Sequence, residues 1–159
     1  MPAQMLVAFR HDAEWSVRQV IARVTGTPVH CVTVYGEDVY DATASGVKKR
    51  TSRERFASGR WEVVYIPPTY NSVRAQALAE TRVGWRYDWM GVLVAWWLGR
   101  PGGRGHAGKV FCSEQCADEL IAAGVPLRYA RTARYHPRLL RDELTQRFGF
   151  TSRWDGERT

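Results

Sequence analysis

Residues 111–120 read Phe-Cys-Ser-Glu-Gln-Cys-Ala-Asp-Glu-Leu, and this stretch has the clearest helical pattern of the sequence. Apolar positions after Cys112 recur at helical spacing, and Gly124 follows them as a stop signal. These positions are Cys116, Ala117, Leu120 and Ile121. The pattern predicts an amphipathic helix with Cys112 in its first turn. Unpaired backbone N–H groups and the helix dipole stabilise a thiolate there, although a small buried residue without chemistry would fit the same pattern.

Length and composition favour one folded domain. The 159 residues are 45% hydrophobic and include seven tryptophans, so we expect a single domain over residues 1–159 with a tail that frays after about residue 150. The longest apolar run, Trp89 to Leu98, is far shorter than the roughly 20 residues that cross a bilayer. Residues 1–10 lack a secretory pattern, which predicts a cytoplasmic protein or one released by lysis or dedicated export.

Cysteine usage and charge restrict the chemistry further. Cys31, Cys112 and Cys116 form neither a disulfide framework nor a CxxC pair, so we expect no metal and no cofactor. The net charge is +7, and only three of the 23 basic residues are lysine. A positive surface favours anionic partners such as a cell-wall polymer, whereas no motif predicts specific nucleic-acid binding.

The order of predicted elements indicates an α+β fold, with strands first and helices mostly behind them. The predicted strands are Met5 to Phe9, Val29 to Tyr35, Asp38 to Thr43 and Trp61 to Ile66. Helices are predicted after Asp12 up to Val24, from Asn71 to Val83 and from Trp89 to Leu98. Two more are predicted to begin at Cys112 and at Pro137. Lys48 to Arg60 is polar and basic and is interpreted as a surface excursion, and Gly99 to Gly108 as a flexible loop.

A histidine on the second strand is the candidate base for Cys112. If Gly36 and Glu37 form a two-residue turn, Val32 pairs with Asp41, and His30 and Asp41 become diagonal neighbours on one face. An acid beside the imidazole can orient it toward a nucleophile. One extra residue in the turn would move Asp41 to the other face. Glu37 is the weaker alternative for the orienting acid.

The same residues resemble a known family. His30 follows Thr25-Gly26-Thr27-Pro28-Val29, Asp41 lies in Val39-Tyr40-Asp41-Ala42, and Gly84 to Asp88 reads Gly-Trp-Arg-Tyr-Asp. Phe111-Cys112-Ser113-Glu114 and Pro137 to Leu140 come later, in that order. Together they are similar to the circularly permuted, YiiX-like branch of the NlpC-type papain-like cysteine hydrolases, which is distantly related to the lecithin:retinol acyltransferases. In that branch the histidine strand precedes the cysteine helix.

This resemblance implies a small antiparallel sheet packed against helices, with the nucleophile at a helix N-terminus. It implies Cys112 as nucleophile, His30 as base and then acid, and Asp41 as orienting acid where the family more often has glutamate. It also implies Tyr87 near the oxyanion, for which the Cys112 N–H is another donor. The substrate implied is a peptide or amide, with a bacterial cell-wall fragment as the first class.

Two other functions stay open. The same site would serve a lipid acyltransferase or thioesterase if Trp89, Trp96 and Trp97 lined an apolar groove, although Phe-Cys-Ser-Glu differs from the acyltransferase sequence Asn-Cys-Glu-His. A non-enzymatic basic module that binds an anionic polymer is the other alternative, and the oligomeric state is open. The remaining candidates are interpreted as follows: His106 as a backup base, His136 as a turn residue, Cys116 as core and Cys31 as packing opposite His30.

Overall fold

The computed structural model describes residues 3–12, 26–92 and 108–154. In this part the chain is an α+β protein built on a six-stranded antiparallel sheet in the order β4-β3-β2-β1-β5-β8. The strands of this sheet are β1 (Met5–Arg10), β2 (His30–Tyr35), β3 (Asp38–Thr43), β4 (Gly46–Thr51), β5 (Trp61–Tyr65) and β8 (Ser152–Trp154). A separate parallel pair consists of β6 (Arg86–Tyr87) and β7 (Lys109–Val110).

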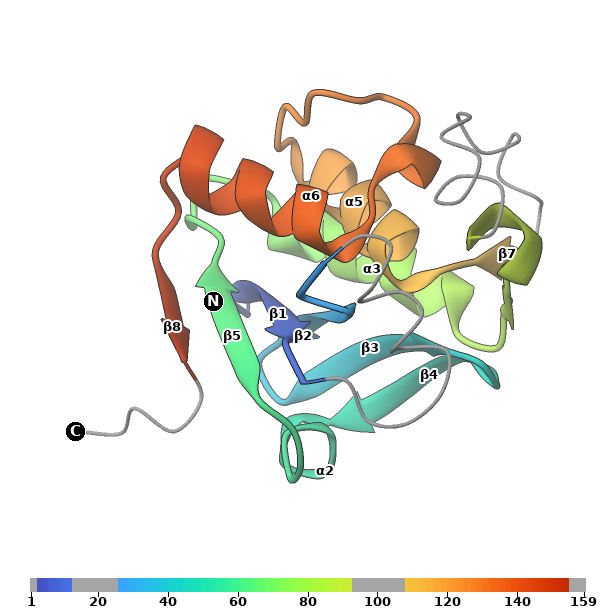
Figure 1. The fold of residues 1–159 in the computed structure, drawn as a ribbon. Helices are drawn as coiled ribbons and strands as arrows, with labels where there is room; N and C mark the ends of the chain where they lie inside the picture. The colour runs from blue at the N-terminus through green and yellow to red at the C-terminus, as the bar shows by residue number, and fades with distance from the viewer. Residues whose placement is uncertain (1–2, 13–25, 93–107, 155–159) are drawn as a thin grey trace.

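Helices cover the sheet mainly from one side, as Figure 1 shows for α3, α5 and α6. The helical elements are α2 (Ser52–Arg55), α3 (Ser72–Arg82), α5 (Cys112–Ala123), the 3₁₀ turn η1 (Thr132–Arg134), α6 (Pro137–Asp142) and the π-helical turn η2 (Glu143–Arg147). None of the helices in the described ranges is long and apolar enough to span a membrane.

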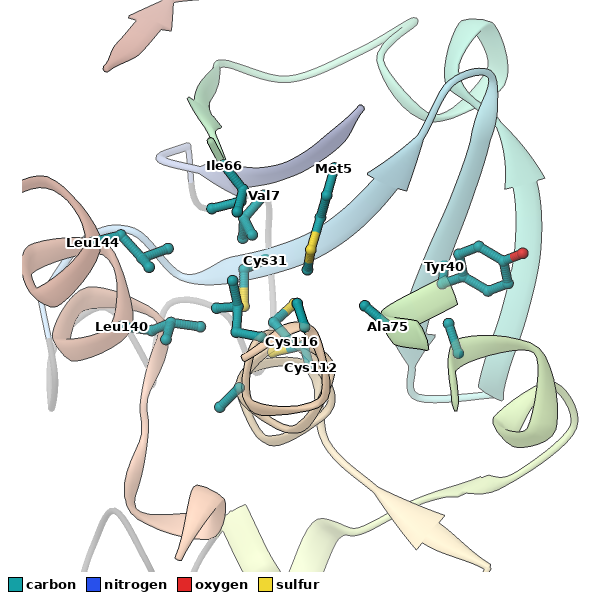
Figure 2. Close-up of a cluster of buried hydrophobic side chains, with 14 of the residues drawn as sticks. Met5, Val7, Cys31, Tyr40, Ile66, Ala75, Cys112, Cys116, Leu140 and Leu144 are labelled. Atoms are coloured by element: carbon teal, nitrogen blue, oxygen red, sulfur yellow. The ribbon is translucent and has the colours of Figure 1, made fainter. Parts of the chain in front are cut away.

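Apolar side chains are buried on both faces of the central strands. Toward α5, the larger cluster joins side chains such as Val7 and Cys31 from the sheet to Cys116 from the helix, as Figure 2 shows. The opposite face carries a smaller cluster around Trp61, to which Val32 contributes. Because side chains alternate along a strand, Val32 lies on the Trp61 face while Cys31 lies on the α5 face. His30 is the first residue of β2, and at this end of the strand its ring lies near Trp61 and also contacts Cys112. The central strands are therefore continuous buried runs, and the β-branched pattern after Val29 is explained.

Several local predictions are confirmed. The hairpin turns at Gly36 and Glu37, with Tyr35 paired to Asp38 as predicted. Helix α5 begins at Cys112 and ends before Gly124, whose φ of 97° is a left-handed conformation that glycine adopts without strain. Helix α6 begins at Pro137, and His136 caps it by accepting the Leu139 N–H at Nδ1 over 3.2 Å.

Two predictions are wrong, and both concern edge strands. Residues Lys48 to Arg60 are not simply a surface excursion, because Gly46–Thr51 is strand β4, paired along its length with β3, and α2 follows it. The sequence predicts a tail that frays after about residue 150, but Ser152–Trp154 forms strand β8 and pairs with β5. Edge strands are half exposed and carry charged residues, so they lack the apolar alternation by which a strand is recognised.

Some predictions fall outside the described residues. They are the helix after Asp12, most of the helix predicted for residues 89–98, and nearly all of the glycine-rich loop with His106. Trp89 and Met90, at the start of the predicted helix, are exposed.

Candidate active site

Cys112 is the first residue of α5 and is almost fully buried, with 2% of its surface exposed. The helix begins there because Phe111 is extended and Glu114, three residues on, accepts the Phe111 N–H at 3.4 Å. This is half of a capping box, the contact that closes the first turn of many helices. The backbone N–H groups of the first turn have no partner within the helix. The thiol therefore sits at the positive end of the α5 dipole.

His30 and Asp41 lie together, as the hairpin register predicts. His30 Nε2 is 2.8 Å from Asp41 Oδ1, and both side chains are buried. The contact follows from the two-residue turn, because pairing of Thr33 with Tyr40 leaves His30 and Asp41 diagonal on one face. Glu37, the alternative acid, is exposed at the turn. Asp41 is thus the carboxylate that orients the imidazole.

Cys112 and His30 form a charged pair. The pKa of the Cys112 thiol lies well below its ordinary value, because a hydrogen bond from the Cys31 thiol and the charge of His30 outweigh burial. Burial alone would lower the pKa of His30, but the charges of Cys112 and Asp41 raise it to about 9. The two shifts have opposite signs, and both favour a thiolate beside an imidazolium over two neutral groups.

Tyr87 reaches Cys112 through the short parallel pair. Tyr87 is the partner of Val110 across β6 and β7, and Val110 precedes Cys112 by two residues. Burial, the Cys112 charge and a hydrogen bond to Cys112 hold the pKa of the Tyr87 hydroxyl well above its ordinary value. The neutral hydroxyl therefore donates to the Cys112 sulfur.

Cys31 contacts Cys112, which the sequence did not predict. It packs on the face opposite His30, as expected, but its thiol also faces α5, where Cys112 and Cys116 lie (Figure 2). Burial and a hydrogen bond to Cys112 raise the pKa of Cys31 well above its ordinary value, so Cys31 remains a thiol and donates to Cys112. Cys116 is a core residue as predicted, and burial raises its pKa. Only Cys112 among the three is set up to ionise.

A second missed residue is Arg55. Its Nε is 2.7 Å from Asp41 Oδ2, the carboxylate oxygen that His30 leaves uncovered. The sequence placed Arg55 in the basic surface stretch, since it carries no pattern that distinguishes it from the neighbouring Arg53. Only the capping box of α2, where Thr51 accepts the Glu54 N–H and Glu54 the Thr51 N–H, indicates an ordered turn at this point.

A metal site has no support in the described ranges. Within residues 3–12, 26–92 and 108–154, no group of three or more histidine, cysteine, aspartate or glutamate side chains is arranged to hold a metal ion. Nucleophilic catalysis by cysteine needs a thiol, a base beside it and an acid that orients the base. Cys112, His30 and Asp41 are groups of these three kinds in contact with one another.

Comparison of the chain with protein-family models, with curated proteins and with solved structures finds no match in any of the three. The resemblance to permuted papain-like hydrolases therefore stays a hypothesis that rests on the quoted motifs.

Proposed function

We propose that this chain is a permuted papain-like thiol hydrolase that cleaves an amide bond, with bacterial cell-wall peptide as the first substrate class. One observation carries the proposal: His30 lies between the Cys112 thiol and the Asp41 carboxylate, with its proton affinity raised by both. A buried cysteine in a purely structural role keeps its proton, as Cys31 and Cys116 do. The low pKa of Cys112 therefore favours catalysis over packing.

The proposed reaction begins with the ion pair. The Cys112 thiolate attacks the carbonyl carbon of the amide, and the C=O electron pair moves onto the oxygen. The Cys112 N–H at the helix end and the Tyr87 hydroxyl, released from the sulfur as it forms its new bond, donate to this oxyanion. When the tetrahedral intermediate collapses, the C–N bond breaks, and the His30 imidazolium gives its proton to the leaving amine.

The second half returns the enzyme to its starting state. Neutral His30 takes a proton from water, and the resulting hydroxide attacks the thioester carbon. The C–S bond breaks, the acid product leaves, and the Cys112 thiolate and His30 imidazolium are restored. Asp41 holds the imidazole in one orientation throughout, so the same ring atom serves both proton transfers.

The test is pH-resolved alkylation of each cysteine by iodoacetamide, read by mass spectrometry. Cys112 alone is expected to react rapidly below about pH 7, because an unperturbed thiol ionises near pH 8.5. In His30→Ala the rate at pH 6.5 should fall about 100-fold, as the thiolate fraction of an ordinary thiol requires. His11→Ala is the matched control and should leave the rate unchanged. A Cys112 that titrates like a free thiol would overturn the proposal.

An acyltransferase or thioesterase acting on lipid is the second candidate, and one observation favours it. Trp89 and Met90 are 39% and 63% exposed, and the centre of the Trp89 ring lies 4.7 Å from that of the Tyr87 ring. Apolar surface thus adjoins the site. To separate the amide hydrolase from the lipid acyltransferase, the protein is incubated with wall fragments and with acyl lipids, and the mass added to Cys112 is measured. A peptidyl thioester and a fatty-acyl thioester differ in mass. Salt-sensitive polymer binding without any adduct would favour the basic module.

A further inference from the structure

The carboxylate of Asp41 is held from both sides. Its Oδ1 meets His30 Nε2 at 2.8 Å, and its Oδ2 lies 2.7 Å from Arg55 Nε. Arg50 is a more distant neighbour, with Nε at 3.8 Å and a side chain that is 38% exposed. The Arg55 side chain is only 10% exposed. Because water screens the Arg55 contact least, it is the stronger of the two arginine contacts.

Arg55 is itself fixed by the fold. It is the last residue of α2, and its guanidinium carbon is 4.5 Å from the centre of the Trp61 ring. Trp61 is fully buried, and its ring also lies 6.4 Å from the His30 ring in an edge-on arrangement. Packing on a buried ring restricts where a guanidinium can lie, and from this place Arg55 contacts the carboxylate of Asp41. The same tryptophan therefore borders both His30 and Arg55.

We propose that Arg55 is a positioning residue for this site: it binds the outer oxygen of Asp41 and so keeps that carboxylate turned toward His30. The proposal rests on the proposed thiol hydrolase for its catalytic meaning. A carboxylate buried with only one partner would be free to rotate. With Arg55 in place, both oxygens are engaged, and the imidazole is presented to Cys112 in one orientation.

Charge gives this role a measurable consequence. Arg55 neutralises part of the Asp41 charge, and so weakens the attraction between Asp41 and the His30 proton. Loss of the arginine charge should therefore raise the pKa of His30, while the ring also becomes less well oriented. The titratable and charged groups that face His30 and Asp41 from the surrounding elements are Arg10, Lys48, Arg50, Arg55, Tyr87 and Cys112.

The experiment compares four full-length proteins: wild type, Arg55→Gln, Arg55→Lys and Arg53→Gln. Arg53 is the matched control, because it is an exposed arginine of the same short helix. The pKa of His30 is measured by NMR titration, and the hydrolysis of p-nitrophenyl acetate is followed against pH. Thermal melting shows whether each variant is folded.

In Arg55→Gln we expect the pKa of His30 to rise by about half a unit to one unit and the maximal rate to fall about tenfold. Arg55→Lys keeps the charge but not the planar contact, so the pKa of His30 should return to the wild-type value and the rate should recover in part. Arg53→Gln should match wild type in both.

An unchanged or lowered pKa of His30 in Arg55→Gln, or an equal shift in Arg53→Gln, would overturn the role of Arg55. Failure of the role of Arg55 and failure of the proposed hydrolase give different results. If wild-type Cys112 proves unreactive while the pKa of His30 still responds to Arg55, the hydrolase is wrong, and the coupling of Arg55 to His30 through Asp41 stands.

Discussion

Two clusters in this molecule each contain a histidine, a carboxylate and an arginine, and they differ in whether a thiol lies beside the histidine. His30, Asp41 and Arg55 form one, and His11, Glu62 and Arg141 form the other, with His11 Nε2 at 2.9 Å from Glu62 and Arg141 at 3.0 Å from the same carboxylate. In both, an arginine and a histidine share a buried carboxylate. Only the first also has a thiol next to the histidine.

The pKa values of the two histidines move in opposite directions. Burial lowers the pKa of His11 despite its contact with Glu62, whereas the charges of Cys112 and Asp41 overcome burial and raise the pKa of His30 to about 9. A carboxylate already shared with an arginine does not keep a proton on a buried imidazole by itself. The thiolate makes the difference, so the ion pair of Cys112 and His30 is the feature that distinguishes a candidate active site from a structural cluster.

Removing the thiol should have the largest effect. In Cys112→Ser we expect hydrolysis to fall by at least about 10³-fold, because the nucleophile is lost. The pKa of His30 should also fall toward that of His11, since only Asp41 is left to oppose burial. Activity assays and NMR titration of both histidines measure the two effects. A His30 that still titrates near its wild-type value would show that the thiolate is not the source of the difference.

Removing the carboxylate charge tests the two clusters side by side. Asp41→Asn should reduce hydrolysis about 100-fold, because the imidazole loses its orienting partner and its proton is held less strongly. Glu62→Gln should leave hydrolysis per folded molecule unchanged but lower the free energy of unfolding by about 1–3 kcal/mol, since Arg141 and His11 lose a buried charged acceptor. Activity and urea unfolding are measured for both. Equal loss of activity in the two variants would contradict the comparison.

The pH dependence should separate proton donation from nucleophilicity. As pH rises through about 9, His30 loses the proton that the leaving amine needs, so hydrolysis should fall about tenfold per pH unit above that value. Alkylation of Cys112 should not fall, because the thiolate remains once its partner is neutral. Hydrolysis that continues to rise beyond pH 9, as with an ordinary thiol, would show that the ion pair is not the reacting species.

Sequence reasoning worked where one local pattern decides the outcome. The apolar stripe and Gly124 predict α5, and the two-residue turn predicts the register that brings His30 to Asp41. It failed for β4 and β8, because an edge strand needs only a partner strand and not a pattern of its own. It also missed Arg55 and the thiol contact of Cys31, since Arg55 has the same type as the nearby Arg53 and Cys31 fits the strand as a packing residue.

The amino-acid sequence by itself determined the elements that carry Cys112, His30 and Asp41, because helical periodicity, β-branched runs and turn length act within a few residues. Only the tertiary structure decided which groups surround the thiol. Tyr87 arrives through the pairing of β6 with β7, Cys31 through packing of α5 on the sheet, and Arg55 through packing on Trp61. Such contacts join segments distant along the chain, and they depend on how whole faces bury one another, which no local pattern encodes.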